Sequence, residues 1–208
     1  MAMIETALTR LLGIQHPILL APMGSAAGGR LAAAVTNAGG LGLVGSGYAD
    51  ANTIRRELTA AGNTRVGIGF ILWALEKNPS ALDVALDAKP AAVMLSFGDP
   101  TPFTARIRGA GCKVICQVQT LAQAKEAAAA GAHVIIAQGR DAGGHSAMKR
   151  GTMGSSRQRL MPSHRSLLSL PAESPTGEDL RPHSPWAQPA SRWGPDSLPH
   201  ANHFGIRR

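Results

Sequence analysis

One histidine of this sequence stands where a titratable side chain could reach a substrate. His145 ends the segment Gln138-Gly139-Arg140-Asp141-Ala142-Gly143-Gly144-His145, which follows an apolar run. Because an imidazole exchanges a proton near neutral pH, a histidine in such a place can act as a general base. His133 opens an apolar run and His16 precedes one, so we predict that both are structural or exposed. His145 is the candidate catalytic residue, and an exposed loop histidine is the alternative interpretation.

Glycines are frequent where the apolar runs end, and this placement favours a bound cofactor. The ends are Ala21-Pro22-Met23-Gly24-Ser25, Gly45-Ser46-Gly47, Gly67-Ile68-Gly69-Phe70 and the segment before His145. Glycine lets backbone N–H groups come close to a flat or phosphorylated ligand, whereas a purely structural turn needs only one. We therefore predict a cofactor site formed by these ends.

Hydrolytic and metal chemistry are not indicated. The sequence has no paired carboxylates, nucleophile elbow or metal-ligand cluster. Asp99 and Asp141 stand alone, which predicts loop or cap residues. Cys112 and Cys116 lie within one apolar run, so we predict reduced packing residues and no metal site.

The elements that must position these residues alternate between two kinds. Short β-branched runs predict strands, and the Ala-rich segments between them have helical spacing. The predicted strands are Pro17–Met23, Leu41–Gly47, Val66–Leu72, Ala92–Gly98, Lys113–Gln119 and His133–Gly139. The predicted helices are Gly29–Ala38, Ala51–Ala61, Ser80–Ala88, Pro102–Ala110 and Leu121–Ala130, with Gly39-Gly40 and Gly131 as C-caps.

Buried runs followed by helices describe parallel strands joined by crossovers, so the fold class is α/β with about six βα units. A doubly wound sheet and an incomplete (β/α)₈ barrel both fit this count. In either architecture ligands bind at the carboxyl ends of the strands. These are the ends that carry the glycines and His145.

Length and composition restrict the class of protein. The 208 residues are 44% hydrophobic and 16% charged, which is enough to form a core. The net charge of +8 is spread over the chain without a dense basic stripe, so we predict no nucleic-acid partner. Apolar runs are too short to span a membrane and no secretory signal is visible, so we expect a cytoplasmic protein.

The composition changes near residue 154. Residues 155–208 contain 8 of the 14 prolines and no Val or Lys. Proline removes the donors that a helix or ladder needs. We predict an irregular Pro/Ser-rich tail over 155–208, after a first part over 1–154.

Several motifs of the first part resemble the nitronate monooxygenase family, formerly called 2-nitropropane dioxygenases. They are Thr9-Arg10-Leu11-Leu12-Gly13-Ile14, Pro17-Ile18, Ala21-Pro22-Met23, Ala38-Gly39-Gly40-Leu41-Gly42, Gln138-Gly139 and Ala142-Gly143-Gly144-His145. The resemblance covers about residues 5–154. It implies a TIM (β/α)₈ barrel that binds FMN and oxidises alkyl nitronates with O₂.

The resemblance also implies roles for single residues. Pro22 and Met23 would line the flavin ring, Gln138 and Gly143 would contact FMN, and His145 would be the active-site base. The full cofactor-binding set that it implies is Ala21, Pro22, Met23, Gly24, Gln138, Gly143 and Gly144. This chain departs from the pattern at Gly69, where family members often have Asn at the end of the third strand.

Two later family segments, Gly-Gly-Ile-x-Asp-Gly-Arg-Gly and Gly-Thr-Arg-Phe, are not present as written. Reading the tail codons one base upstream permits both, in family order, from Pro171–Leu180 and Trp193–Ser197. We infer that the reading frame slipped near Gly154, by loss of one base or gain of two. The chain would then be an incomplete barrel followed by an out-of-frame tail.

Three hypotheses about function follow. The first is an FMN-dependent nitronate monooxygenase, for the parent with an intact frame. The second is a flavin-dependent enoyl-acyl-carrier-protein reductase, which resembles the same motifs and would need a reduced nicotinamide. The third is a non-catalytic truncated remnant, because a barrel that lacks strands leaves edges unpaired and its interior open to water.

Overall fold

The computed structural model describes residues 4–139, 142 and 145. All of them belong to the first of two units into which the chain divides, Met1–Leu170, and the predicted tail over 155–208 lies outside the described residues. The helices are α1 Ala7–Leu12, α2 Gly29–Asn37, α3 Ala51–Ala60, α4 Leu72–Leu75, α5 Ser80–Asp87, α6 Thr101–Gly109 and α7 Leu121–Ala129. The strands are β1 Leu43–Gly45, β2 Gly67–Ile71, β3 Ala92–Ser96, β4 Lys113–Val118 and β5 Val134–Ala137.

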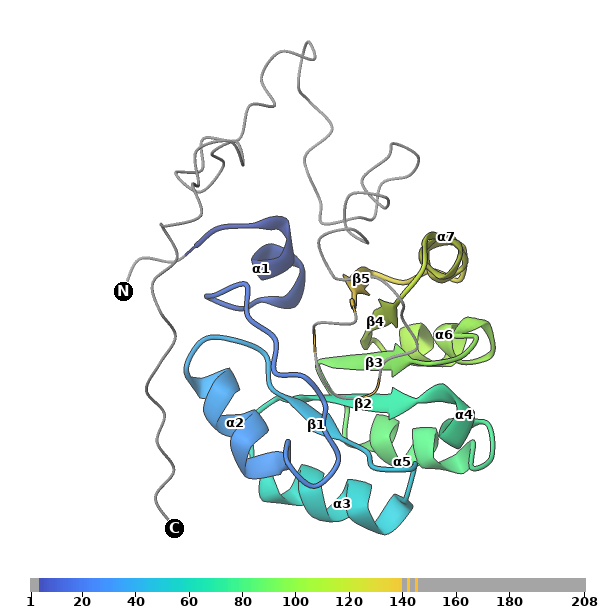
Figure 1. Ribbon diagram of the computed structural model, residues 1–208. Helices are drawn as coiled ribbons and strands as arrows, with labels where there is room; N and C mark the ends of the chain where they lie inside the picture. The colour runs from blue at the N-terminus through green and yellow to red at the C-terminus, as the bar shows by residue number, and fades with distance from the viewer. Residues whose placement is uncertain (1–3, 140–141, 143–144, 146–208) are drawn as a thin grey trace, which may run out of the picture. The chain divides into compact units, whose positions relative to one another are not determined.

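The five strands form one parallel sheet in the order β1-β2-β3-β4-β5 (Figure 1). Each strand pairs with the next one along the chain, and every described crossover carries at least one helix. Strand residues are buried on both faces, as expected for apolar runs that do not alternate with polar residues. The α/β class and five of the predicted strands are therefore confirmed.

The first predicted strand, Pro17–Met23, was wrong as an element of this sheet. It reaches β1 only through an isolated parallel bridge between Leu19 and Leu41. Two ladder hydrogen bonds flank that bridge, from Leu20 N–H to Leu41 O and from Leu41 N–H to Ile18 O. The prolines at both ends of this segment have no N–H to extend the ladder.

Helix ends agree with the predicted ones to within about one residue, and two short helices were missed. Thr6 and Thr9 form a capping box that begins α1. Leu72 is the first residue of helix α4, although the sequence predicted it as the end of a strand. Gly39 and Gly131 have positive φ angles of 94° and 91° next to the ends of α2 and α7, as predicted for C-caps.

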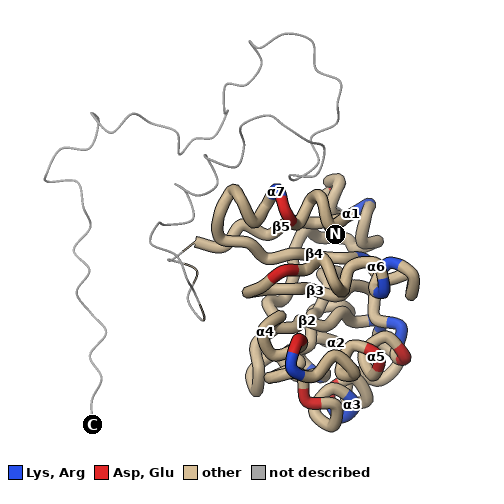
Figure 2. Tube along the Cα trace, turned by 90° about the vertical axis from the view of Figure 1, so that its right-hand side faces the viewer, with Lys and Arg blue, Asp and Glu red and all other residues tan. Residues whose placement is uncertain are grey.

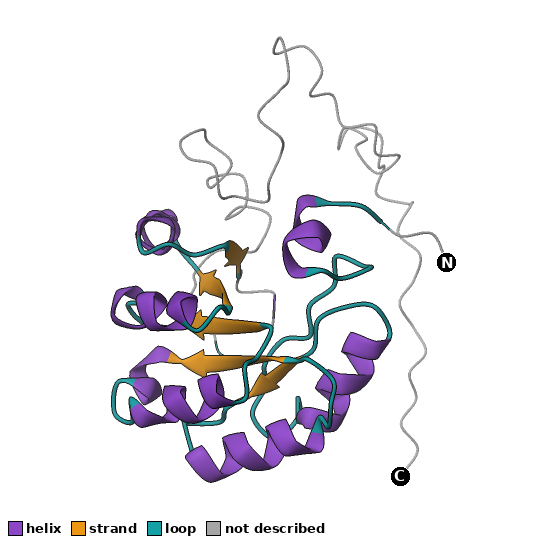
Figure 3. Cartoon of the chain, turned by 180° about the vertical axis from the view of Figure 1, so that it is seen from behind, coloured by secondary structure: helices purple, strands orange, loops and turns teal. Residues whose placement is uncertain are grey.

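The two faces of the sheet pack differently, and this difference separates the two candidate architectures. Helices α2 to α7 cover the outer face, where Val44, Ile68 and Val93 belong to the main core (Figure 3). The inner face carries Leu43, Met94, Ile115 and their neighbours, against which Leu12, the last residue of α1, and Ile14 pack. A doubly wound sheet has crossover helices on both faces, whereas a barrel has them on one. The fold is a partial TIM barrel with an apolar interior.

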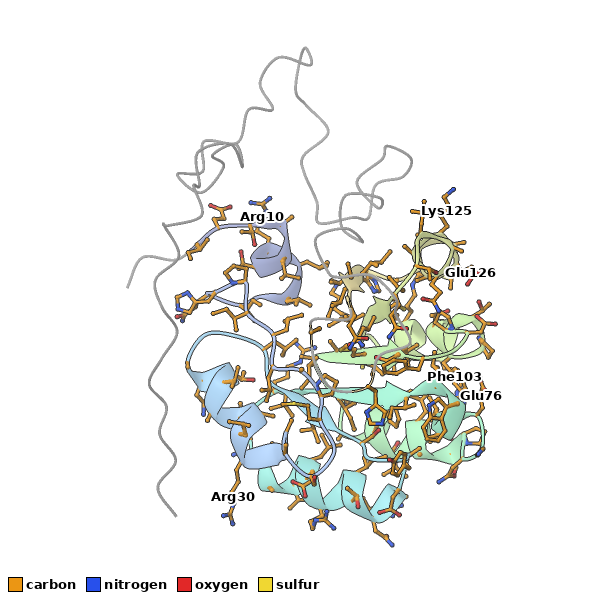
Figure 4. The ribbon with its side chains drawn as sticks, viewed as in Figure 1. Arg10, Arg30, Glu76, Phe103, Lys125 and Glu126 are labelled. Carbon is orange, nitrogen blue, oxygen red and sulfur yellow. The ribbon has the colours of Figure 1, made fainter. Side chains whose placement is uncertain are left out.

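Charged residues belong mainly to the helices and loops outside the sheet (Figure 2). Arg30 of α2 and Lys125 and Glu126 of α7 lie at the outside of the fold (Figure 4). Within the described ranges, the structure has no helix of the length and apolarity needed to cross a bilayer.

Candidate functional site

The inner face of the sheet changes from apolar to polar toward the carboxyl ends of the strands. In β4, Ile115 faces inward, and Gln117 and Gln119 follow on the same face because side chains alternate along a strand. Gln117 pairs in register with Ser96 of β3, which is buried. The predicted site residue Gln138 follows β5 directly. A group of amides and a hydroxyl therefore lies at the end where ligands bind in barrels.

Three glutamines form a hydrogen-bonded group. The Oε1 atom of Gln138 accepts from Nε2 of Gln117 at 2.7 Å and from Nε2 of Gln119 at 2.6 Å. The Nε2 atom of Gln138 donates to the main-chain carbonyl of His145 at 2.9 Å. Since an amide oxygen has two lone pairs, the acceptor capacity of Gln138 is used, and its second N–H has no partner among residues 4–139, 142 and 145.

His145 is exposed at the carboxyl end of β5. Its ring centroid lies 6.3 Å from that of Phe97, which follows β3, and the two rings are tilted by 59°. Phe97 has a φ of 61°, which is the left-handed region of backbone conformation. Its ring therefore points in a different direction from that of a residue with strand conformation. The structure thus brings the His145 backbone and the Gln138 side chain together, whereas Gly143, Gly144 and Asp141 lie outside the described residues.

The segment Ala21–Gly24 crosses the carboxyl ends of β1 and β2. A Cβ atom at Gly45 would lie 2.6 Å from the carbonyl carbon of Met23, and one at Gly69 would overlap Pro22 Cγ. These two glycines therefore make room for Met23 and Pro22 of the chain itself, which is the physical reason for glycine at both positions. The Pro22 ring fills the space that an Asn side chain at Gly69 would need. Met23 itself is 45% exposed and is available to a ligand.

Several site residues were missed by the sequence reasoning. Gln117 and Gln119 are polar residues two apart in an apolar run, a spacing that places both on one face of a strand. That spacing was the available signal. Ser46 follows β1 and is 1% exposed, and within the described part of the chain its Oγ has no hydrogen-bond partner. A buried hydroxyl without a partner is costly unless a ligand or water satisfies it.

The residues predicted to be structural behave as expected where they are described. Asp99 Oδ1 accepts from Thr101 N–H at 2.9 Å at the start of α6, and hydrogen bonding from the Thr101 side chain and backbone lowers the pKa of the Asp99 carboxyl. His133 Nδ1 accepts from Val114 N–H at 2.9 Å. Cys112 and Cys116 are free and buried, and desolvation raises the pKa of the Cys116 thiol to about 12. A thiol held neutral in this way is a packing residue.

Comparisons with known proteins agree with this geometry. The family model for nitronate monooxygenase matches residues 5–79 and 63–173. A nitronate monooxygenase from Paraburkholderia phytofirmans is 34% identical over 182 residues, with 68% of this chain and 50% of that protein covered. The (3aS,4S,5R,7aS)-5-hydroxy-7a-methyl-1-oxo-octahydro-1H-indene-4-carboxyl-CoA dehydrogenase of Rhodococcus jostii is 30% identical over 148 residues, with 70% of this chain and 42% of that protein covered.

Solved structures give the same picture. FabK from Thermotoga maritima matches with a TM-score of 0.69 and 32% identity, over 75% of this chain and 50% of that one. Nitroalkane oxidase from Streptomyces ansochromogenes matches with a TM-score of 0.57 and 27% identity, over 73% of this chain and 54% of that one. The chain spans about half the length of the curated relatives it matches.

Proposed function

Because the chain belongs to the nitronate monooxygenase family, we propose that its function, in a protein with the reading frame intact, is the FMN-dependent oxidation of alkyl nitronates by O₂. The observation that carries this proposal is the position of His145. It is exposed at the carboxyl end of β5, beside Phe97, and its backbone is held by Gln138. A base fixed by its backbone keeps its imidazole free to meet a substrate.

The residues at this end of the sheet fit a flavin. Exposed Met23 and half-buried Pro22 offer an apolar surface for a flat ring, and they are held over β1 and β2 by close backbone packing. Among the described residues, one amide hydrogen of Gln138 and the Oγ of Ser46 have no hydrogen-bond partner. Ala21 and Gly24 are exposed on the same segment. We assign Ala21 to Gly24 and Gln138 to the cofactor, together with Gly143 and Gly144 from the sequence motif.

In this proposal the chain binds the cofactor and the substrate, orients them, and moves a proton. His145 removes the α-proton of a neutral nitroalkane or holds the nitronate by its charge. Phe97 presents an apolar ring next to the imidazole and limits water there. Bound FMN supplies the electron acceptor that O₂ later reoxidises, so the protein contributes orientation and electrostatics.

The proposed function requires the strands that should follow residue 154, and the inferred frame slip explains why residues 155–208 do not supply them. If 155–208 are out of frame, the family segments that would complete the barrel are encoded but not translated here. Resequencing the gene across the codon for Gly154 tests this directly. An uninterrupted frame that still reads as the printed tail would remove the frame slip from the proposal.

Activity is tested on the frame-restored protein. We expect it to purify with a bound flavin and to consume oxygen with an alkyl nitronate. Absence of both bound flavin and oxygen uptake would contradict the proposed function. The same assay on the 208-residue chain separates a catalytic chain from a non-catalytic remnant.

The likeness to FabK supports a second candidate, a flavin-dependent enoyl-acyl-carrier-protein reductase. This enzyme would take electrons from a reduced nicotinamide. Flavin reduction by nicotinamide, without reduction by nitronate, would decide for it. The opposite pattern would decide for the nitronate reaction.

A further inference from the structure

Two exposed aromatic rings and a lysine form a cluster that the proposed reaction does not use. Tyr48 is 66% exposed and Trp73 is 42% exposed, and their ring centroids lie 5.5 Å apart with a 36° tilt. The Lys77 ammonium lies 5.7 Å from the centroid of the Trp73 ring. We call Tyr48, Trp73 and Lys77 the aromatic cluster.

The cluster is built on a fixed framework. Asn78 Nδ2 donates to the carbonyl of Ala49 at 2.8 Å, and this bond joins the loop of Tyr48 to the segment of Lys77. Ala49 is buried, and the neighbours of Trp73 in α4, Leu72 and Ala74, are buried as well. The rings are therefore exposed while the backbone that carries them is anchored. Such anchoring lowers the entropy that binding would cost.

The cluster lies at the functional end of the sheet. Tyr48 follows β1 and Trp73 follows β2, so both stand at the carboxyl ends of parallel strands. Gln138 and His145 follow β5 at the same end. In barrels this end is where loops of different strands bind different parts of the substrates.

The charges around the cluster favour an anion. Within the described ranges, no carboxylate lies within ion-pair distance of Lys77. The neighbouring acid, Glu76, lies toward the loop after β3, where a Cβ at Gly98 would be 3.6 Å from its Oε1 (Figure 4). Asp50 Oδ2 accepts from Thr53 N–H at 2.7 Å as the N-cap of α3, so the positive end of that helix offsets its charge. One cation beside two aromatic faces suits a flat ring that carries a negative group.

We propose that Tyr48, Trp73 and Lys77 bind the nucleotide part of a second ligand, with its base stacked on the exposed aromatic rings and a phosphate at Lys77. This site goes beyond the proposed reaction, because neither an alkyl nitronate nor O₂ carries an aromatic ring. The shared chemistry is that of adenine nucleotides, whether they belong to coenzyme A or to a nicotinamide dinucleotide.

The test is binding of AMP to the purified 208-residue chain, measured by titration calorimetry and independent of flavin or turnover. Adenosine reports the ring alone and inorganic phosphate the charge alone. Tyr48→Ala should weaken AMP and adenosine alike, by about tenfold, since base stacking contributes about 1–3 kcal/mol. Lys77→Gln should weaken AMP about fivefold and leave adenosine within about twofold.

The control is Lys89→Gln, which removes a lysine from the loop between α5 and β3, at the opposite end of the sheet. It should bind AMP like the unchanged chain. Both test residues lie outside the core, so circular dichroism should show an unchanged fold. Titrations with coenzyme A and with NADP⁺ then identify which nucleotide the site takes. The one that binds with the lower Kd is the better ligand.

Three results would overturn the proposal. The first is no AMP binding by the unchanged chain, and the second is an AMP affinity that Tyr48→Ala leaves unaltered. The third is self-association that Tyr48→Ala abolishes, which would assign the cluster to a second copy of the chain.

Discussion

The side chain of Gln138 holds the backbone of His145: its Nε2 donates to the His145 carbonyl at 2.9 Å. The opposite end of the same amide accepts from Gln117 and Gln119. Three inward-facing amides thus join β4, the end of β5 and the loop that carries the candidate base. This assigns Gln138 a positioning role in addition to the predicted contact with FMN.

Gln138→Glu separates the two roles. A carboxylate still accepts from Gln117 and Gln119 but cannot donate to the His145 carbonyl. In the frame-restored protein we expect kcat to fall about fivefold to tenfold at saturating flavin, since one hydrogen bond is worth about 1 kcal/mol. Gln15→Glu, at an exposed position, is the control. A change in flavin affinity with unchanged kcat would leave Gln138 only the cofactor contact.

His145→Ala tests the base. A neutral nitroalkane must lose a proton before it can be oxidised, whereas a preformed nitronate has already lost it. We expect the variant to lose about 10²-fold or more of its turnover on the nitroalkane and much less on the nitronate. Oxygen consumption with each substrate measures both, with His16→Ala as control. Equal losses on the two substrates would argue against proton removal by His145.

Gly69→Ala should destabilise the chain. The added Cβ would overlap Pro22, so the segment before α2 must shift, at a cost of about 1–3 kcal/mol. Adding Pro22→Gly removes both Pro22 side-chain atoms that the new Cβ would overlap, so it should recover at least about 0.5 kcal/mol relative to the sum of the single changes. Urea unfolding measures all three variants. Gly109→Ala is the control, because a Cβ there meets no atom within 4 Å. If the changes at Gly69 and Pro22 show no coupling energy, the close packing of Pro22 on Gly69 is refuted.

The stability of the chain should fall as pH drops below about 6.5, partly through His133. Burial, with the charges of Lys113 and Arg108, lowers the pKa of His133 below its ordinary 6.5. The unfolded chain therefore binds the proton first, and stability is fully present above the unfolded pKa and lost as pH falls. Protonation also removes the acceptor for Val114 N–H, a bond worth about 1 kcal/mol.

The check is urea unfolding at about pH 7.5 and about pH 5.5. His133→Asn replaces the ring with a neutral side chain, so its stability should change less between the two buffers than that of the unchanged chain. His16→Asn should behave like the unchanged chain. An identical pH dependence in His133→Asn and the unchanged chain would rule out this contribution.

Much of the fold was predictable because its signals are local. The Ala-rich segments have helical spacing, and caps such as Gly39 and Gly131 follow from the need for positive φ. The strand Pro17–Met23 was not correctly predicted, since a strand exists only through its neighbours and Leu19 makes a single bridge. Parallel strands alone did not distinguish a barrel from an open sheet. The position of helices α2 to α7 on one face of the sheet decided it.

The site was predicted in part for the same reason. His145 and Gln138 could be found because they lie in one motif. Gln117 and Gln119 gained their role from a contact with a residue about twenty positions away, and a glutamine in an apolar run carries no sign of its partner. Tyr48 and Trp73 belong to different βα units, so their proximity also depends on the fold.

The strand order of the sheet has a consequence for how this chain assembles. Because each strand pairs with the one synthesised just before it, almost every sheet contact closes a loop of only one βα unit. Such short loops have a low entropic cost and favour fast folding. The sheet can therefore grow from β1 by one unit at a time while the ribosome is still translating, so that synthesis and folding proceed in the same direction.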